Sequence, residues 1–289
     1  MSITTAYIGI ILIWSTTPLA IKWSGEEAGF LFGVTARMLI GTFICLLIMA
    51  FMRIKLTWNK KAIQSYLAAS MGIFGSMLLT YWGAQFITSG MLSVLFGFTP
   101  LLTGILAAWV LKERSLTASK ITGVAFGITG LIAVFYTDIA QADQAIPGIL
   151  AVLMATTLHS LSTVTIKKIN CHLPGLVINA GSLIISSILF LIVWVFSDAQ
   201  LPENISLKSG ISILYLGVLG NVVGFTLYFY ALKNMAANKI GMIPLITPVI
   251  ALTLGYIFNQ EPLGWKLILG SGLILLGLVI HQWGNKIKF

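Results

Sequence analysis

Residues 90–111 read GMLSVLFGFTPLLTGILAAWVL and contain no charged side chain. A helix needs roughly 20 apolar residues to cross the hydrocarbon core of a bilayer, so this run predicts a transmembrane helix. Residues 240–258, IGMIPLITPVIALTLGYIF, form a second such run with a Thr-Pro pair near its middle, like the first. We therefore expect a membrane protein in which one helix pattern occurs twice.

Charge-poor runs of similar length recur along the whole chain and leave only short connections. They cover residues 4–22, 29–52, 66–87, 90–111, 121–137, 146–166, 175–197, 210–232, 240–258 and 267–284. A transmembrane β-strand would alternate apolar and polar residues over about ten positions, and these runs do not alternate. We predict an all-α integral membrane protein with ten transmembrane helices. The first run lacks a basic leader and a clear cleavage site, so we expect a retained helix and not a signal peptide.

The composition excludes most soluble functions. Hydrophobic residues make up 58% of the 289 positions and charged residues 9%, whereas ordinary soluble domains carry about 25% charged residues. In a soluble protein the net charge of +9 would suggest a nucleic-acid ligand. Here the charge belongs to the loops, and we expect no nucleic-acid partner. Cys45 and Cys171 give neither a disulfide framework nor the spacing of metal ligands.

Basic and acidic residues are concentrated in alternate loops. The exceptions are Glu113 in a basic loop and Lys22, Lys208 and Lys266 in or beside acidic ones. The even-numbered loops and the C-terminal tail contain Arg53, Lys55, Lys60, Lys61, Lys112, Arg114, Lys120, Lys167, Lys168, Lys233, Lys239, Lys286 and Lys288. The odd-numbered loops contain Glu26, Glu27, Asp138, Asp143, Asp198, Glu203 and Glu261. Because cytoplasmic loops carry an excess of Lys and Arg, we expect both termini in the cytoplasm. An even number of helices agrees with this orientation.

The chain resembles itself at an offset of about 145–148 residues. The corresponding positions include Tyr81 with Tyr228, Ala84 with Ala231, Thr99-Pro100 with Thr247-Pro248, Glu113 with Glu261, and Gly130-Leu131 with Gly277-Leu278. Residues 1–144 and 145–289 would then each hold five helices. Because five is odd, the second half must insert upside down relative to the first. Inverted repeats of this kind build transporters whose substrate site lies at the repeat interface, near the midplane of the membrane.

The two halves share a set of short motifs. The first half has Tyr81-Trp82-Gly83-Ala84, Thr99-Pro100 and Lys112-Glu113-Arg114; the second has Tyr228-Phe229-Tyr230-Ala231, Thr247-Pro248 and Gln260-Glu261-Pro262. With these motifs the chain resembles the EamA-type family of the drug/metabolite transporter (DMT) superfamily over nearly its whole length. Trp14, Arg37 and His159 also stand where the family pattern has aromatic, basic or polar residues. The resemblance implies a secondary transporter of the cell inner or plasma membrane, often an exporter of amino acids or other small metabolites.

Two ionisable side chains fall well inside the predicted helices. His159 lies midway along residues 146–166, and an ionisable group in lipid is costly enough to indicate a functional site. Histidine titrates near neutral pH, which suits proton coupling or binding of a substrate carboxylate. The alternative is a neutral histidine bonded to Ser160, to Ser162 or to a backbone carbonyl. Arg37 would attract an anionic substrate group. Its alternatives are to snorkel outward or to bond carbonyls freed at a helix break.

A set of polar and aromatic residues in the predicted helices would line a mixed apolar cavity with a few hydrogen-bonding points. With Arg37 and His159, the expected substrate-binding residues are Trp14, Ser15, Thr17, Tyr81, Trp82, Gln85, Asn221, Tyr228 and Tyr230. Aromatic residues near the ends of the runs, such as Trp109, Trp194 and Trp283, are expected instead to be anchors at the membrane interface.

The two Thr-Pro pairs are the expected gating elements. Proline removes a backbone donor and opens a kink, so Pro100 and Pro248 predict symmetry-related kinks beside the cavity, with Thr99 and Thr247 supplying hydroxyls. Ordinary packing kinks are the alternative, and Pro18 has no counterpart in the second half. Glu113 and Glu261 lie just beyond helix ends, where we expect capping or loop salt bridges.

Glycines at small-xxx-small spacing, Gly123–Gly127 and Gly220–Gly224, allow helices to approach closely, either within one bundle or across a homodimer. We expect a monomer or a homodimer.

The acidic residues all lie in loops or at helix ends. The absence of a carboxylate from the membrane interior argues against proton-coupled efflux of permanently cationic drugs. A Gly-rich phosphate loop and an HExxH pair are also absent, so we expect no cofactor, no metal and no catalytic residues. The prediction is a transporter of a small polar or zwitterionic metabolite, amino acids in the export direction first. The alternatives are facilitative import of a nucleoside or sugar derivative, and an integral-membrane enzyme.

Overall fold

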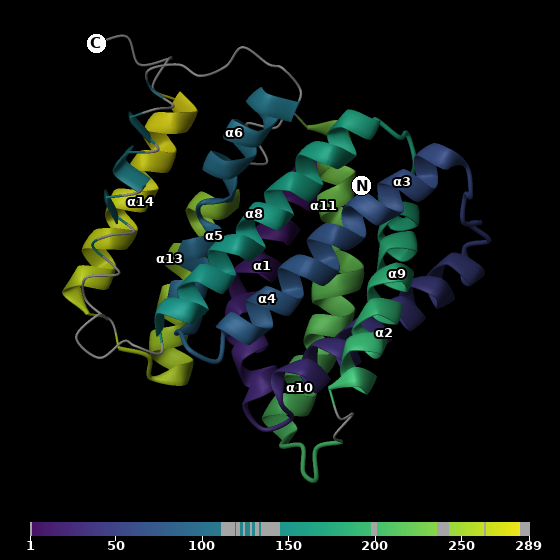
Figure 1. Cartoon of the computed structure of the whole chain (residues 1–289), viewed down its shortest axis with the longest axis horizontal. Helices are drawn as coiled ribbons and strands as arrows, with labels where there is room; N and C mark the ends of the chain where they lie inside the picture. Colours follow the sequence, from purple (N-terminus) through teal and green to yellow (C-terminus); the bar gives the residue numbers. More distant parts are fainter. Residues whose placement is uncertain are drawn as a thin grey trace.

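The computed structural model describes residues 2–110, 145–197, 201–235, 243–262 and 264–283, with scattered positions between 119 and 133. In this part of the chain every regular element is a helix (Figure 1). The first half holds α1 (Ile3–Glu26), α2 (Phe30–Phe51), α3 (Lys60–Ser70), α4 (Ser76–Gly83), α5 (Ser89–Phe96) and α6 (Thr99–Val110). The second half holds α8 (Ala145–Ile169), α9 (Gly175–Phe196), α10 (Leu207–Tyr215), α11 (Phe225–Asn234), α13 (Ile243–Asn259) and α14 (Trp265–Trp283). Most of the expected fifth helix, residues 121–137, lies outside the described residues, as do Glu113 and the expected boundary at residue 144.

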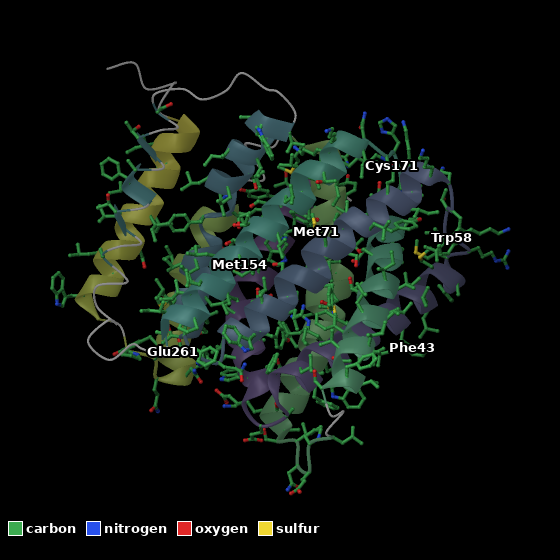
Figure 2. The ribbon with its side chains drawn as sticks, viewed as in Figure 1. Phe43, Trp58, Met71, Met154, Cys171 and Glu261 are labelled. Carbon is green, nitrogen blue, oxygen red and sulfur yellow. The ribbon has the colours of Figure 1, made fainter. Side chains whose placement is uncertain are left out.

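Seven segments of the described chain are long and apolar enough to cross a membrane. They are Ile3–Glu26, Phe30–Phe51, Lys60–Gly83, Ser89–Val110, Ala145–Ile169, Gly175–Phe196 and Leu207–Asn234, and shorter apolar helices cover Thr247–Asn259 and Ile268–Gly277. Large apolar side chains cover the outside of the bundle. Phe43 is 63% exposed and Met154 is 60% exposed (Figure 2). Such a surface is stable against lipid and would aggregate in water.

Two of the predicted helices contain a stretch of π-helix. The segment η1 (Met71–Gly75) separates α3 from α4, and the segment η2 (Leu216–Gly224) separates α10 from α11. The two segments occupy corresponding places in the two halves of the chain. A π-turn widens the helix locally and is frequent at functional sites. Nothing in the apolar pattern of residues 66–87 or 210–232 predicted it.

The kink expected at Pro100 is a complete break. Helix α5 ends at Phe96 and α6 begins at Thr99, so Pro100 lies in the first turn of α6 and not in a helix interior. A proline is tolerated in the first turn because the N–H it lacks has no partner there. Pro248, by contrast, lies inside α13, as expected, and Pro18 lies inside α1.

Packing between the halves is reciprocal. Helix α1 contacts α13 while α8 contacts α6, and α2 contacts η2 while α9 contacts η1. Helices α4 and α8 lie side by side across the front of the bundle (Figure 1), and α1 and α11 make the corresponding contact. Each half therefore meets the other through the same kinds of element.

The connecting loops gather at two opposite ends of the bundle. At one end Lys208 forms an ion pair of 2.7 Å with Glu26, and Glu27 accepts from the backbone N–H of Ser206. At the other end Lys233 donates to the carbonyl of His172 at 3.2 Å. Figure 2 places Trp58 and Cys171, in the loops after α2 and α8, far from Glu261, in the loop after α13. In these described segments, successive loops lie at opposite ends of the bundle, as expected from the charge pattern.

Glycines bring neighbouring helices into direct contact. A Cβ on Gly277 would lie 2.5 Å from the carbonyl oxygen of Gly123, so this small-residue face packs within the chain, as in the first of the two alternatives for these glycines. A Cβ on Gly41 in α2 would lie 2.7 Å from the Cβ of Asn221 and 3.1 Å from the carbonyl oxygen of Gly217. The contact between α2 and η2 depends on the absence of a side chain at residue 41.

We predict that Gly41→Ala lowers the free energy of unfolding in detergent by about 1–3 kcal/mol, because the added methyl group overpacks this contact. Gly272→Ala in α14 is the matched control, since a Cβ there meets nothing within 4 Å. Alanine is the better helix former by about 1 kcal/mol, so the control variant should melt at an equal or higher temperature. Thermal unfolding of the two purified variants measures both effects. Equal melting temperatures for the two variants would contradict the prediction.

Candidate functional site

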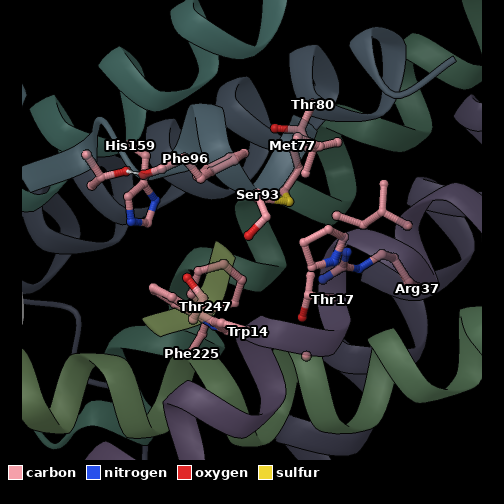
Figure 3. Close-up of a pocket in the computed structure, with 15 residues that line it drawn as sticks. Trp14, Thr17, Arg37, Met77, Thr80, Ser93, Phe96, His159, Phe225 and Thr247 are labelled. Atoms are coloured by element: carbon pink, nitrogen blue, oxygen red, sulfur yellow. Dashed lines mark hydrogen bonds between the residues drawn. The ribbon is translucent and has the colours of Figure 1, made fainter. Parts of the chain in front are cut away.

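A cavity lies at the centre of the bundle, between the two halves (Figure 3). The volume of the cavity is about 90 Å³. Its lining residues are Trp14, Thr17, Pro18, Ile21, Arg37, Met77, Thr80, Leu92, Ser93, Phe96, Thr99, His159, Gly220, Phe225 and Thr247. Seven of these residues have apolar or aromatic side chains, and seven carry a hydroxyl, imidazole or guanidinium group. Ligand sites typically combine these two features.

Three of the lining hydroxyls donate to backbone carbonyls of their own segment. Thr17 donates to the carbonyl of Ile13 at 2.7 Å. Thr80 and Thr99 bond in the same way to carbonyls of neighbouring residues, at 2.7 Å and 2.6 Å. A hydroxyl has one proton to donate, so each of these oxygens is left as an acceptor.

Arg37 is the one cationic side chain in the lining, and it is 1% exposed. One terminal nitrogen donates to Oδ1 of Asn221, and the other donates to the Tyr81 hydroxyl at 3.4 Å. The guanidinium also lies 5.8 Å from the centre of the Tyr81 ring. Its Nε–H has no acceptor, and it forms no ion pair with any described carboxylate. Arg37 therefore does not snorkel outward, because neutral groups hold it inside the bundle.

Both halves of the chain hold Arg37 in place. Asn221, in η2, donates through Nδ2 to the backbone carbonyl of Arg37 at 2.9 Å while its Oδ1 accepts from the guanidinium. From the first half, Ser24 donates to the Tyr81 hydroxyl at 3.1 Å. Asn221 and Tyr81, both expected to bind substrate, therefore act on the cavity by positioning Arg37.

Trp14 and His159 meet across the centre of the bundle. Their ring centres are 6.0 Å apart, and each ring packs against Tyr228 at 5.1 Å and 5.5 Å. The Tyr228 hydroxyl bonds Thr163 at 2.6 Å. The Nδ1 atom of His159 is buried without a partner, so the alternative of a histidine bonded to Ser160 does not account for this atom.

The structure separates the other expected site residues into several locations. Thr99 and Thr247 line the cavity, whereas Pro100 and Pro248 are not among its lining residues. Ser15 is buried and donates to the carbonyl of Ile11. Trp82 and Gln85 are exposed, and Tyr230 is partly buried at the edge of the core.

A second cavity lies beside the central one. It is lined by Ile21, Lys22, Gly25, Glu26, Phe30, Tyr81, Ala84 and Gln85. Ile21 borders both cavities, and the hydroxyl of Tyr81 reaches Arg37 in the wall of the central one. Tyr81 therefore stands between the two spaces.

Sequence reasoning missed several lining residues. They are Pro18, Ile21, Met77, Thr80, Leu92, Ser93, Phe96, Gly220 and Phe225. Helical spacing offered a signal, because residues three or four positions apart share a face. Trp14, Thr17 and Ile21 follow this spacing on α1 and would have extended the set from one known member. No such signal was available for Gly220, which reaches the cavity through the π-helix.

Glu261 forms a second polar cluster, at the end of the bundle that holds Glu26. Its carboxylate accepts from the backbone N–H groups of Ser89 and Gly90 at 2.9 Å and 3.1 Å and from the Ser89 hydroxyl at 2.9 Å. Asn259 donates to the same carboxylate at 3.0 Å. A carboxylate suits the first turn of a helix, where N–H groups lack partners. The capping role expected for Glu261 is confirmed, and it caps a helix of the other half.

The described residues contain no group of three His, Cys, Asp or Glu side chains that could hold a metal ion. The polar groups of the central cavity are suited to binding a ligand through hydrogen bonds and one positive charge.

Comparison with known proteins gives whole-length matches. The model of the EamA-like transporter family matches residues 2–136 and again residues 146–281. The uncharacterized transporter YoaV of Bacillus subtilis is 29% identical over 96% of this chain and 95% of its own length. Protein PagO of Salmonella typhimurium is 26% identical over 97% of this chain and 91% of its own length. One solved crystal structure has a similar fold, with a TM-score of 0.71 and 18% identity over 99% of both chains.

We predict that Glu261→Gln lowers the free energy of unfolding by about 1.5–3 kcal/mol, because the amide replaces a charged acceptor that faces N–H groups. Glu203→Gln, on an exposed loop at the same end, is the matched control. Surface changes of this kind usually stay within about 0.5 kcal/mol. Thermal unfolding in detergent checks both variants. If the two variants have equal melting temperatures, the Glu261 cap does not stabilise the fold.

Proposed function

The chain belongs to the EamA-like transporter family of the DMT superfamily, and we propose that it moves a small polar or zwitterionic metabolite across the membrane by alternating access at the central cavity. It is a transporter and not an enzyme, because the family is one of transporters and the relative YoaV is named a transporter. We propose amino acids as the substrates, in the export direction.

One observation carries this proposal. The cavity lies where helices of both halves meet, and it combines aromatic walls with a buried arginine. In transporters built from repeats, the substrate site lies at the repeat interface. We assign substrate contact to Trp14, Thr17, Arg37 and His159, with Tyr81, Asn221 and Tyr228 positioning them. Ser15, Trp82, Gln85 and Tyr230 drop out of the proposed contact set, because none of them lines this cavity.

We propose that the whole chain has ten transmembrane helices in two inverted repeats, residues 1–144 and 145–289. Three observations support this architecture: the reciprocal contacts between halves, the π-segments η1 and η2 at corresponding places, and the two successive matches to the family model. We place the protein in the cell inner membrane, as a monomer or a homodimer, with both termini in the cytoplasm. The end of the bundle that holds Glu26 and Glu261 then faces outward.

We propose that the two Thr-Pro pairs form the gates. Pro100 at the start of α6 and Pro248 inside α13 each lack a backbone N–H. Each follows a threonine that lines the cavity. Irregular backbone in a membrane is tolerated where protein or a cavity covers it. These two points are also where a helix can bend at low cost, because fewer backbone hydrogen bonds have to break.

For the transport site, we predict that Thr247→Val lowers substrate flux into proteoliposomes about two- to tenfold, because it removes one hydrogen-bonding group from the cavity wall. Thr253→Val is the matched control, since Thr253 lies on the same helix and is exposed. The flux of labelled amino acids and other small metabolites is the measurement. No protein-dependent flux of any of them would overturn the proposed function, and equal flux in the two variants would remove Thr247 from the site.

For the orientation, we predict opposite labelling of two single cysteines by an impermeant maleimide in intact cells. Asn204→Cys should react from outside, and Lys60→Cys should react only after the membrane is opened. Both positions are exposed, and Cys171→Ser removes the one native cysteine that is not fully buried. Reaction of Lys60→Cys in intact cells would reverse the proposed topology.

A further inference from the structure

We infer that Arg37 binds the carboxylate of the transported substrate, and that the cavity recognises a carboxylate on an apolar body without requiring an ammonium group. This inference rests on the proposed transport function and deepens it by naming the substrate class.

The guanidinium has donors to spare. Arginine carries five N–H groups, and the structure gives acceptors to two of them, Oδ1 of Asn221 and the Tyr81 hydroxyl. The bond to Tyr81 is long, at 3.4 Å, and the buried Nε–H has no acceptor. A guanidinium binds a carboxylate through two parallel N–H groups, which is the strongest hydrogen-bonding arrangement available to it. Arg37 is one of the residues that line the cavity (Figure 3).

The charge of Arg37 has no counter-ion in the described part of the chain. Each of three described acids has its own partner: Glu26 pairs with Lys208, Glu27 accepts from Ser206, and Glu261 caps α5. Glu203 lies on an exposed loop. A buried charge is costly unless it is paired, so an entering anion gains the full attraction of Arg37 and removes that cost.

An ammonium group meets a different environment. None of the described lining side chains is a carboxylate, and the hydroxyls of Thr17, Thr80 and Thr99 use their protons within their own segment. A neutral hydroxyl replaces the hydration of a cation less well than a carboxylate would. The amino group of an amino acid therefore adds little to binding, whereas its carboxylate supplies most of the recognition.

The remaining walls fit an apolar body. Trp14, Phe96 and Phe225 supply aromatic surface, and Met77 and Leu92 supply flexible apolar surface. The apolar body gains free energy by leaving water. Arg37 and the aromatic walls together select an amphipathic anion of small size.

The test is a ligand series in which only the charged groups differ. The first triad is 3-phenylpropionate, phenylalanine and phenethylamine; the second is 4-methylpentanoate, leucine and isopentylamine. Binding to the purified full-length protein is measured by the rise in melting temperature and by Trp fluorescence quenching, with flux measured in proteoliposomes. We expect each carboxylic acid without an amino group to bind at least as tightly as its amino acid, and we expect no binding of either amine.

Two variants locate the effect at Arg37. Arg37→Lys keeps the charge and loses the planar pair of donors, so we expect carboxylates to bind about tenfold more weakly. Arg37→Gln removes the charge, and we expect a loss of about a hundredfold, in line with the value of hydrogen bonds to charged groups. If Arg37→Gln fails to fold, Arg37→Lys and the wild-type ligand series still decide the matter.

The outcomes separate this inference from the proposed function. The inference would be overturned if the amines bound as tightly as the carboxylates, or if binding required the amino group. Measured flux in the same experiments would still support the proposed transport function. Absence of binding by every carboxylate in both triads would overturn it as well. Absence of flux for all metabolites tested is the separate result that would remove the transport function.

Discussion

The lack of water in the bilayer core forces every backbone polar group to find a partner within the protein, and the rest of this structure follows from that constraint. It explains why all the described regular elements are helices. It also predicts the places where a helix can be irregular, because non-helical backbone within a membrane is stable only where protein covers it or where it lines a cavity. The break before Thr99, the proline Pro18 inside α1, and Gly220 in η2 all border the central cavity. These three departures from ideal helix lie where a ligand site would use them, whereas η1 and Pro248 lie outside the lining.

The same constraint acts more strongly on charge. Arg37 is among the largest fully buried side chains, and neutral groups from α4 and η2 hold it without an ion pair to a described carboxylate. Asn221 makes two of the hydrogen bonds that hold Arg37, one to the guanidinium and one to its backbone carbonyl. Gly41 makes the approach of Asn221 sterically feasible. The Arg37 guanidinium, the Asn221 amide and the absence of a side chain at Gly41 thus join the two halves beside the cavity. The guanidinium is left without a carboxylate partner among the described residues.

At the end of the bundle that holds Glu26 and Glu261, the halves are joined by a different interaction. Glu261 of the second half caps α5 of the first, and Trp23 donates to Asn259 at 2.9 Å in the same region. These bonds cross between the two halves of the chain. In a protein that works by alternating access, contacts of this kind must exchange as one end closes and the other opens. Hydrogen bonds to a helix N-terminus suit that role, because they are directional and break without disturbing an apolar core.

The sequence by itself determined the class of this protein, the alternation of its loops and the family to which it belongs. These properties depend on composition, on the length of apolar runs and on the spacing of a few motifs, all of which act locally along the chain. It also pointed to Trp14, Thr17, Arg37, His159, Thr99 and Thr247, because polar or aromatic residues in the middle of apolar runs are unusual enough to notice.

Only the tertiary structure decided what these residues do together. The exposed positions of Trp82 and Gln85, the positioning roles of Tyr81 and Asn221, and the break before Pro100 all depend on which helix faces which. In a chain that is apolar on nearly every face, hydrophobic periodicity does not distinguish a lipid-facing side from a cavity-facing side. That distinction arises from packing between segments as far apart as residues 37 and 221, and no local pattern records it.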